Sequence, residues 1–172
     1  GYDFWLQTAP DIPTFEARLA AGAYDLAYMN PYHYVVFHQT PGYVAFAKEQ
    51  AQQVRGIVVV HKDSPYQTLS ELRSHTLAFP APAAFAASVL TQGHLAEEGV
   101  PFTPVYVVSH DSVYLSVAQG LYVAGGGMLR TLQMAPPAVR HQLRILWTSP
   151  PYPSPAFGAH PRVPVAIVEQ VL

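Results

Sequence analysis

The chain has 172 residues, half of them hydrophobic, which is enough to build one or two compact units. Nine Lys and Arg residues against eleven Asp and Glu residues give a net charge of −2 without a basic cluster, and this excludes a typical nucleic-acid-binding surface. Cysteine is absent, which excludes disulfides and thiol chemistry, and no apolar run reaches the roughly 18 residues of a transmembrane helix.

Predicted helices and strands alternate from the beginning of the chain. Asp11 or Thr14 is suited to cap a first helix, and Gly22 closes it because glycine adopts the left-handed conformation at low cost. Four short elements are predicted before residue 62. They are a strand over 24–29, a helix over 32–38, and strands over 43–48 and 57–61.

The segment 56–79 carries the clearest local signals. A buried strand runs into a turn at 63–65, and Thr68 with Glu71 forms a T-x-x-E capping box at the start of a short helix. A second apolar strand covers 76–79. A strand, a capped helix and another strand in this order indicate an α/β unit.

The second half of the chain continues the alternation. A helix over 83–98 has apolar residues near a 3.6-residue period and ends before Gly99. The remaining predicted elements are a strand over 105–108, a helix over 112–119, a strand over 122–126, a helix from 136 to 141, a strand over 144–148, a proline-rich loop to 161 and a helix over 165–172. Continuous apolar strands that alternate with helices predict mixed, mostly parallel sheets with helices on both faces.

Four segments together resemble the phosphonate, phosphite and phosphate solute-binding proteins of ABC importers. They are AGAYDLAYMNP at 21–31, GIVVVHKDSPYQTLSELRSHTLAF at 56–79, VVSHDSVYLSVAQG at 107–120 and RILWTSPPYPSPAFGAHPRVP at 144–164. The resemblance implies an α/β protein with the two-lobed type 2 periplasmic binding protein architecture. The family begins with a β-α unit that we expect to be missing here, and it usually continues past the last helix of this chain.

The resemblance also implies a domain organisation and a function. Residues 1–74 and 153–172 are expected to form lobe 1, and residues 75–152 are expected to form lobe 2. The expected protein is a periplasmic or otherwise extracytoplasmic monomer that captures a small phosphonate-like or phosphate-like oxyanion in an interlobe cleft. It would hand this solute to an ABC permease. No catalytic residue, cofactor or metal is expected.

Ten residues are expected to line the cleft. Helix N-termini at the carboxyl ends of strands offer free amides and a partial positive charge to an anion. The candidates are Tyr28, Asn30, Tyr32, Ala83, Ala84, Ser88, Ser109, His110, Asp111 and Tyr122. Plain helix capping explains Ser109–Asp111 equally well, and a plain helix start explains the loop before residue 83. Interlobe packing is the alternative role for two of Tyr28, Asn30, Tyr32 and Tyr34. We favour Tyr28 or Asn30 at the cleft and assign Tyr34 to the core.

Two stretches depart from the family pattern. The family has a Ser-Thr-Ser-Gly loop that binds the oxyanion, whereas residues 81–87 of this chain contain no hydroxyl group before Ser88. Tyr122 stands where aspartate is common in the family. A strongly hydrated oxyanion needs well-placed donors when it is buried. The resemblance therefore implies the fold and the cleft but leaves the identity of the ligand open.

Glycines and histidines in this chain predict neither a dinucleotide site nor a metal site. The run 125–127 lacks the G-x-G-x-x-G spacing, and we expect it to make a tight turn before Arg130. Arg130 either reaches an oxyanion or is solvated. The eight histidines show no H-x-x-x-H pair beside an acidic residue.

Other functions stay open for the same fold. A receptor that presents its solute to a sensor kinase would share these sequence features. A metabolic enzyme is the alternative of a different class, because one fold hosts many functions. An enzyme needs a nucleophile or an acid–base pair, and the adjacent His110 and Asp111 are poorly placed to act on one atom. A chain without its first strand could also be a structural remnant that binds nothing.

Overall fold

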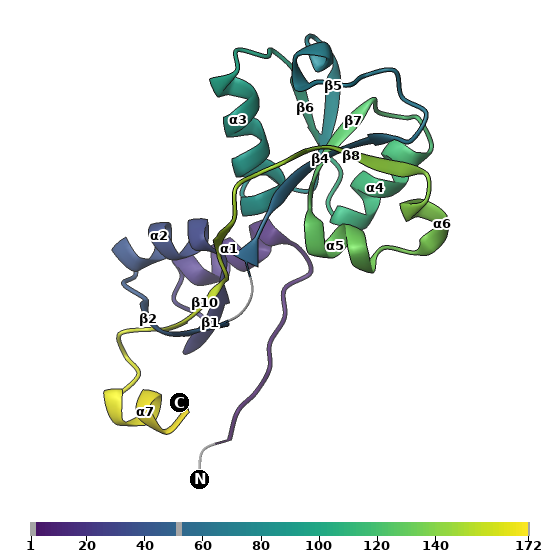
Figure 1. Ribbon diagram of the computed structural model, residues 1–172. Helices are drawn as coiled ribbons and strands as arrows, with labels where there is room; N and C mark the ends of the chain where they lie inside the picture. Colours follow the sequence, from purple (N-terminus) through teal and green to yellow (C-terminus); the bar gives the residue numbers. More distant parts are fainter. Residues whose placement is uncertain (1–2, 51–52, 172) are drawn as a thin grey trace. The chain divides into compact units, whose positions relative to one another are not determined.

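The chain folds into two compact units, each with its own sheet and hydrophobic core (Figure 1). The structure is a computed structural model that describes residues 3–50 and 53–171. Unit 1 comprises Gly1–Lys48 and Pro155–Leu172, and unit 2 comprises Glu49–Ser154. The predicted two-lobed α/β architecture is confirmed.

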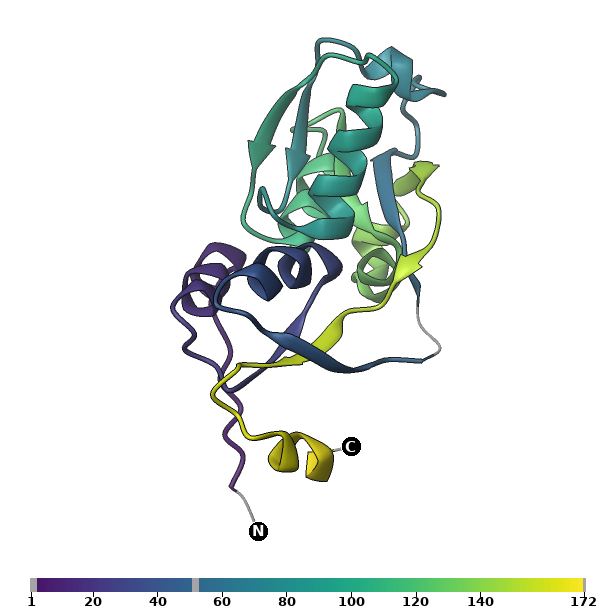
Figure 2. The same ribbon diagram turned by 90° about the vertical axis from the view of Figure 1, so that its left-hand side faces the viewer.

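Unit 1 is built on a three-stranded antiparallel sheet. Its elements are α1 (Ile12–Ala20), β1 (Leu26–Met29), α2 (Pro31–Gln39), β2 (Val44–Lys48), β10 (Ala156–Ala159) and α7 (Val165–Val171). The strand order is β1-β10-β2, so a strand from the second half of the chain lies between two strands from the first third. Figure 2 shows α1 and α2 on one side of this sheet and α7 on the other.

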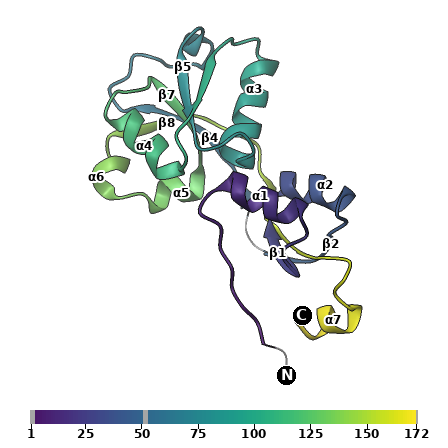
Figure 3. The same cartoon turned by 180° about the vertical axis from the view of Figure 1, so that it is seen from behind.

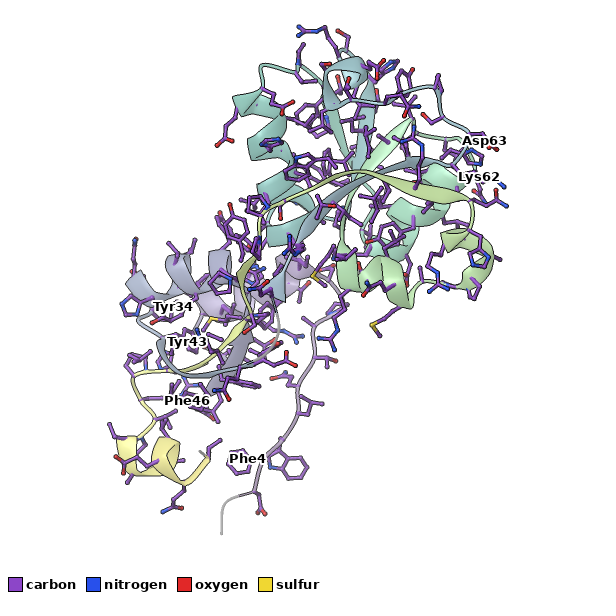
Figure 4. The ribbon with its side chains drawn as sticks, in the orientation of Figure 1. Phe4, Tyr34, Tyr43, Phe46, Lys62 and Asp63 are labelled. Atoms are coloured by element: carbon purple, nitrogen blue, oxygen red, sulfur yellow. The ribbon has the colours of Figure 1, made fainter. Side chains whose placement is uncertain are left out.

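Side-chain caps determine where the first two helices of unit 1 begin. Asp11 Oδ1 accepts a hydrogen bond from Thr14 N at 2.7 Å, which confirms the predicted cap of α1. Asn30 Oδ1 accepts a hydrogen bond from His33 N at 2.7 Å and caps α2 in the same way. The core below these helices contains Leu19, Tyr24, Ala27, Met29, Phe37 and Tyr43, with Tyr34 packed against it (Figure 4).

Unit 2 contains a five-stranded mixed sheet and a separate two-stranded ribbon. Its elements are β3 (Gln53–Val54), β4 (Gly56–His61), the 3₁₀ helix η1 (Leu69–Leu72), β5 (Thr76–Phe79), the π-helix η2 (Phe85–Leu90), α3 (Thr91–Glu97), β6 (Thr103–Tyr106), α4 (His110–Ala118), β7 (Ala124–Met128), α5 (Leu129–Met134), α6 (Pro137–Arg140), β8 (Leu143–Thr148) and β9 (Tyr152–Pro153). The large sheet has the order β6-β5-β7-β4-β8, and β3 pairs with β9.

Unit 2 begins at Glu49, earlier in the chain than the predicted start of lobe 2 at residue 75, because β4 pairs with strands of unit 2. We expected residues 1–74 to belong to lobe 1. β4 instead pairs with β7 on one side and with β8 on the other, and its residues Ile57–Val60 are at most 1% exposed. A strand so deeply embedded in the sheet belongs with it, so residues 49–74 lie in unit 2. The second boundary, predicted between 152 and 153, lies between Ser154 and Pro155.

Strand direction also differs from the expectation of mostly parallel sheets. Among the described residues, parallel pairing is confined to β5 with β6 and β5 with β7. The pairs of β4 with β7 and β8 are antiparallel, as are all pairs of the unit 1 sheet. A continuous apolar strand indicates burial on both faces, and β4 is buried on both faces while its neighbours run in the opposite direction.

Helices cover both faces of the unit 2 sheet, as predicted. On one face, Leu95 of α3 packs with Val58, Val60, Leu77 and Phe79. On the other face, Val113 and Tyr114 of α4 pack with Ile57, Val59 and Ala78. Figure 3 shows α4, α5 and α6 on the face opposite α3. These two clusters hold α3 and α4 in place relative to the strand ends.

The triple glycine forms the middle of β7 rather than the predicted tight turn. All three glycines are buried. A Cβ atom on Gly126 would overlap the carbonyl oxygen of Ala87 in η2, and one on Gly127 would overlap the hydroxyl of Tyr114 in α4. The glycines therefore let helical groups approach β7 directly from both faces.

Two predicted strands are displaced by two residues along the chain. The strand predicted over 105–108 is β6 at Thr103–Tyr106, and the strand predicted over 122–126 is β7 at Ala124–Met128. The proline-rich loop predicted up to residue 161 contains β10, which supplies the middle strand of the unit 1 sheet. Proline and glycine lower the strand propensity of these segments, and sheet pairing outweighs it.

Candidate functional site

Three strand ends of unit 2 meet at one edge of its large sheet. β5 and β6 run in parallel with Phe79 opposite Tyr106, and Val107 N extends the pairing with a hydrogen bond to Phe79 O at 2.8 Å. β7 is parallel to β5 and ends at Met128 on the same edge. The arrowheads of β5 and β6 point to this edge in Figure 2. We call it the carboxyl edge of unit 2.

The first helix at the carboxyl edge begins without a side-chain cap. Ala84 occupies the N-cap position of η2, and its side chain has no oxygen to accept a hydrogen bond. Ser88 N, at 2.7 Å, and Val89 N, at 3.2 Å, both donate to Ala84 O. The amides of residues 85–87 precede these bonds, and such amides have no partner within their own helix. With α3, η2 forms a continuous helical segment from Phe85 to Glu97.

The wide first turn of this segment contains a buried hydroxyl. Ser88 is 0% exposed, and its Oγ atom has no hydrogen-bond partner among the described residues. By contrast, Thr91 Oγ1 donates to Ala87 O at 2.6 Å. An unpaired buried hydroxyl is unfavourable by about 1–3 kcal/mol, and π turns recur at functional sites. These two features set the start of η2 apart from an ordinary helix start.

The second helix at the carboxyl edge, α4, has a complete cap. Ser109 Oγ accepts a hydrogen bond from Ser112 N at 3.0 Å and lies 2.9 Å from the Ser112 hydroxyl oxygen. Asp111 is exposed in the first turn, where a carboxylate stabilises the helix dipole. Ser109 and Asp111 therefore fill the capping role that was one of the two interpretations of this motif.

His110 lies between these two residues and is half-buried. Its Nδ1 atom is buried and has no hydrogen-bond partner among the described residues. Burial lowers the pKa of His110, against a smaller opposing effect of the Asp111 carboxylate. The imidazole is therefore neutral at neutral pH. It offers a hydrogen-bonding group to the carboxyl edge but no full positive charge.

Tyr114 connects α4 to the end of β7. Its ring lies 6.4 Å from that of His110, and its hydroxyl accepts a hydrogen bond from Met128 N at 3.1 Å. The same hydroxyl lies 2.6 Å from Oγ1 of Thr131 in α5. This network holds the start of α4 and the junction of β7 with α5 together. The sequence analysis did not single out Tyr114, although buried tyrosines usually find such partners.

Val108 has a strained backbone just before the cap of α4. Its φ angle is 75°, and Ser109 N donates to Val107 O at 3.0 Å, which closes a three-residue γ-turn around Val108. This turn is rare for any residue, and a β-branched residue with positive φ is an outlier. Val108 is 70% exposed. The sequence gives no signal for this strain, because valine predicts an extended strand here.

Two arginines at the carboxyl edge already have partners. Leu129 N donates to Arg55 O at 3.0 Å, which places the start of β4 beside the end of β7. The guanidinium of Arg55 donates to Ser149 O at 3.4 Å. The guanidinium of Arg130 lies 4.0 Å from a carboxylate oxygen of Glu49. Arg130 is thus neither a lone solvated side chain nor shown to contact a ligand.

The three candidates of unit 1 lie around the end of β1. Tyr28 is 46% exposed, and its ring lies 4.7 Å from that of Phe157 on β10. Asn30 is occupied as the cap of α2, and Tyr32 in the first turn of α2 is 39% exposed. Their contact with a ligand stays a prediction.

The first turn of α2 also contains His33, which the sequence analysis did not select. His33 is 4% exposed, and burial lowers its pKa to about 4. Its Nε2 atom lies 3.4 Å from a carboxylate oxygen of Glu16 in α1, and burial raises the pKa of that carboxyl group. His33 is therefore neutral at neutral pH and packs as a core residue between the two helices.

Six of the seven unit 2 candidates gather at the carboxyl edge, and Tyr122 does not. Ala83, Ala84 and Ser88 belong to the start of η2, and Ser109, His110 and Asp111 belong to the start of α4. Tyr122 precedes β7 and packs against the cluster that contains Val113. Because β7 is parallel to β5, Tyr122 lies at the amino end of these strands. The choice of Tyr122 rests on the family resemblance alone, and its contact with a ligand stays a prediction.

The described residues hold no obvious metal site and no membrane span. Among residues 3–50 and 53–171, no three acidic or histidine side chains are grouped so that they could hold a metal ion. No helix in this part of the chain is long and apolar enough to cross a membrane.

A family model and several solved structures match this chain. The model described as the periplasmic substrate-binding protein of phosphonate ABC transporters matches residues 1–172. No curated protein sequence matches significantly. XAC2383 from Xanthomonas citri bound to ATP superposes with a TM-score of 0.77 at 19% identity, covering 95% of this chain and 67% of its own. A phosphonate transporter binding protein, PA3383 from Pseudomonas aeruginosa, gives 0.77 at 15% identity, covering 95% and 59%.

A third solved structure has methylphosphonate bound. PhnD1 from Prochlorococcus marinus, in complex with methylphosphonate, has a TM-score of 0.75 at 18% identity, covering 88% of this chain and 62% of its own. At these identities the structures show a common fold, and the chain spans roughly three-fifths to two-thirds of their length. The family match extends over the whole sequence. The chain therefore belongs to the family of periplasmic substrate-binding proteins of phosphonate ABC transporters.

Proposed function

We propose that this protein is the solute-binding component of an ABC importer and that it captures a small anionic, phosphonate-like solute outside the cytoplasm. The observation that carries the proposal is the family match over residues 1–172. The family consists of transport components rather than enzymes, which favours binding without turnover. We propose further that the protein is a monomer that delivers its solute to a permease.

The carboxyl edge of unit 2 supports an anionic solute. The amides of residues 85–87 precede the first intrahelical bond of η2, and a helix N-terminus carries about half a positive charge. Ala84 provides no oxygen that would compete for these amides. We propose that Ala83, Ala84, Ser88 and His110 contribute to the solute site, together with Tyr28, Asn30 and Tyr32 from unit 1.

Calorimetric titration tests this proposal. The protein is titrated with methylphosphonate, phosphate, methanesulfonate, acetate and, as an uncharged control, dimethyl sulfone. We expect saturable binding of at least one anion and none of the control, and a bound anion raises the melting temperature by mass action. Binding of the uncharged compound alone, or of no compound in this set, would contradict the proposal. Closure of the two lobes remains an expectation, and small-angle scattering with and without the bound anion tests it.

A further inference from the structure

Unit 2 has a cleft between α4 and the junction of α5 with α6. It has a volume of about 160 Å³ and is lined by Asp111, Tyr114, Leu115, Ala135, Pro136 and Val139. We propose that this cleft binds a small organic ammonium ion whose apolar part is a short alkyl chain or a single aromatic ring. The proposal goes beyond the proposed function, because the cleft uses none of the residues assigned there to the anionic solute.

The walls of the cleft are apolar and suit one small group. Tyr114 and Ala135 are buried and form the floor, and Leu115 is 45% exposed at the rim. The Tyr114 hydroxyl already bonds to Met128 and Thr131, so it does not compete for a polar ligand. Figure 3 shows the three helices on one face of the sheet. Engineered apolar cavities of about 150 Å³ take up one benzene molecule, so a single ring is of the right size.

Asp111 gives the cleft an unpaired negative charge. Of the six lining residues it alone is charged, and within residues 3–50 and 53–171 it has no ion-pair partner. Arg140 of α6 donates instead to Gln133 O at 2.7 Å. Burial has the largest effect on the pKa of Tyr114 and raises it, and the charge of Asp111 acts in the same direction. The carboxylate is therefore close enough to act on the floor of the cleft.

A carboxylate beside apolar walls favours a ligand that carries a positive charge and an apolar part. An exposed ion pair by itself contributes little, because water screens it. Burial of the apolar part adds binding free energy in proportion to the area removed from water. Lysine and arginine side chains combine the two effects when their stems lie along apolar surface. An anion would be repelled by Asp111, so this cleft differs in charge from the site proposed for the solute.

Three probes separate the charge from the apolar part. Benzylammonium has both features, methylammonium has only the charge, and benzyl alcohol has only the ring. Each is titrated into the protein at neutral pH and followed by two-dimensional NMR of the backbone amides. We expect benzylammonium to bind with a Kd on the order of 1 mM, as is usual for so small a ligand in an open cleft. It should bind about fivefold or more tightly than either of the other probes, and the amides of Leu115 and Val139 should shift.

Matched variants assign the two contributions to residues. D111N is expected to weaken benzylammonium about fivefold and to leave benzyl alcohol unchanged. D63N is the control, because Asp63 is an exposed acid that follows β4 and does not line the cleft (Figure 4). L115A is expected to weaken both ring compounds alike, by about threefold. L121A is its control, because Leu121 is 68% exposed and lies outside the cleft.

Each remaining outcome overturns a stated part of the proposal. Equal affinities for benzylammonium and benzyl alcohol, or equal effects of D111N and D63N, would overturn the preference for a cation. Amide shifts confined to segments other than α4, α5 and α6 would overturn the location. Binding of a lysine-rich peptide at these amides without binding of benzylammonium would show a protein-docking surface instead. None of these results bears on the anionic solute, which is tested with anions alone.

Discussion

Two of the helices that start at the carboxyl edge of unit 2, α4 and η2, begin in opposite ways. α4 is capped by Ser109 and carries Asp111 in its first turn, so its own side chains satisfy its N-terminus. η2 begins at Ala84 without a side-chain cap, in a wide π turn that rests on Gly126. The start of α4 is stabilised by its own cap, whereas the start of η2 leaves backbone N–H groups without a side-chain acceptor. This difference favours η2 over α4 as the place where an anion binds.

The largest effect on stability is expected from a substitution of Gly126, the residue of β7 on which the uncapped start of η2 packs. In G126A the new Cβ atom would overlap the Ala87 carbonyl oxygen, which belongs to helix backbone and cannot move alone. We expect a loss of about 3 kcal/mol or more in the free energy of unfolding, typical of overpacking against backbone. Urea denaturation measures it.

Gly93 supplies the matched control for this substitution. Gly93 lies in α3, and nothing lies within 4 Å of a Cβ atom placed on it. G93A is therefore expected to stabilise the protein by up to about 1 kcal/mol, because alanine favours helix more than glycine does. If G126A were as stable as the unaltered protein, the close packing of η2 on β7 would be wrong.

A pH dependence is expected from His33 in the first turn of α2 and His110 in the first turn of α4, because partial or full burial lowers the pKa of each. The pKa of His33 is lowered from 6.5 to about 4, so the unfolded chain binds more protons between these values. Stability is complete above pH 6.5 and is lost as the pH falls toward 4, by up to about 3 kcal/mol. His110 contributes with the same sign, and the raised pKa of Glu16 opposes both.

Chemical denaturation across this pH range measures the effect, and H33N separates the two histidines. Asparagine does not titrate, so H33N should remove the larger part of the pH dependence even though it lowers stability at neutral pH. H110N should remove the smaller part. A stability curve of H33N that is parallel to that of the unaltered protein would contradict the assignment.

A moderate effect is expected when the cap of α4 is removed. S109A deletes the oxygen that accepts the hydrogen bond from Ser112 N and should lower the free energy of unfolding by about 1 kcal/mol. We assign the N-terminal amides of α4 to its own cap and not to the solute, so anion affinity should change less than twofold. Calorimetric titration beside urea denaturation separates the two quantities. A tenfold loss of affinity with no change in stability would mean that Ser109 binds the solute directly.

The smallest effect on stability is expected when a cap is added to η2. Ala84 has φ −67° and ψ 96°, in the extended region that N-cap residues adopt. A84S should stabilise the protein by a few tenths to about 1 kcal/mol. The new hydroxyl should occupy an amide that we assign to the solute, so affinity for methanesulfonate should fall. G93A stabilises the same helical segment without touching its start and is the control. A gain in affinity in A84S would show that the site prefers a hydroxyl.

Local signals predicted much of unit 2. The capping box of Thr68 and Glu71 is present, with Glu71 accepting hydrogen bonds from the amides of Gln67 and Thr68. Ser109 caps α4, and most predicted helices and strands exist within two or three residues of their expected bounds. Capping and hydrophobic periodicity depend on residues within one or two turns, so they can be read from the chain alone.

The sequence predicted two of the strand–helix junctions of the carboxyl edge but only part of their hydrogen bonding and burial. Strand–helix junctions indicated Ala83–Ala84 and Ser109–Asp111, and the structure brings them to one edge. The strain at Val108, the network around Tyr114 and the burial of Ser88 arise from contacts between distant segments. The register of β7, which puts Tyr122 at the amino end of the strand, also depends on distant partners that no local pattern of glycines specifies.

The sequence by itself determined the α/β class, the order of elements, most helix starts and the lack of hydroxyls before Ser88, because these depend on composition and on short-range hydrogen bonds. Only the tertiary structure decided that β4 belongs to unit 2, that β10 completes the sheet of unit 1, and that the glycines of β7 support a wide helical turn. Strand pairing and backbone packing join residues far apart in the chain. The local sequence around a strand does not specify which distant segment it pairs with.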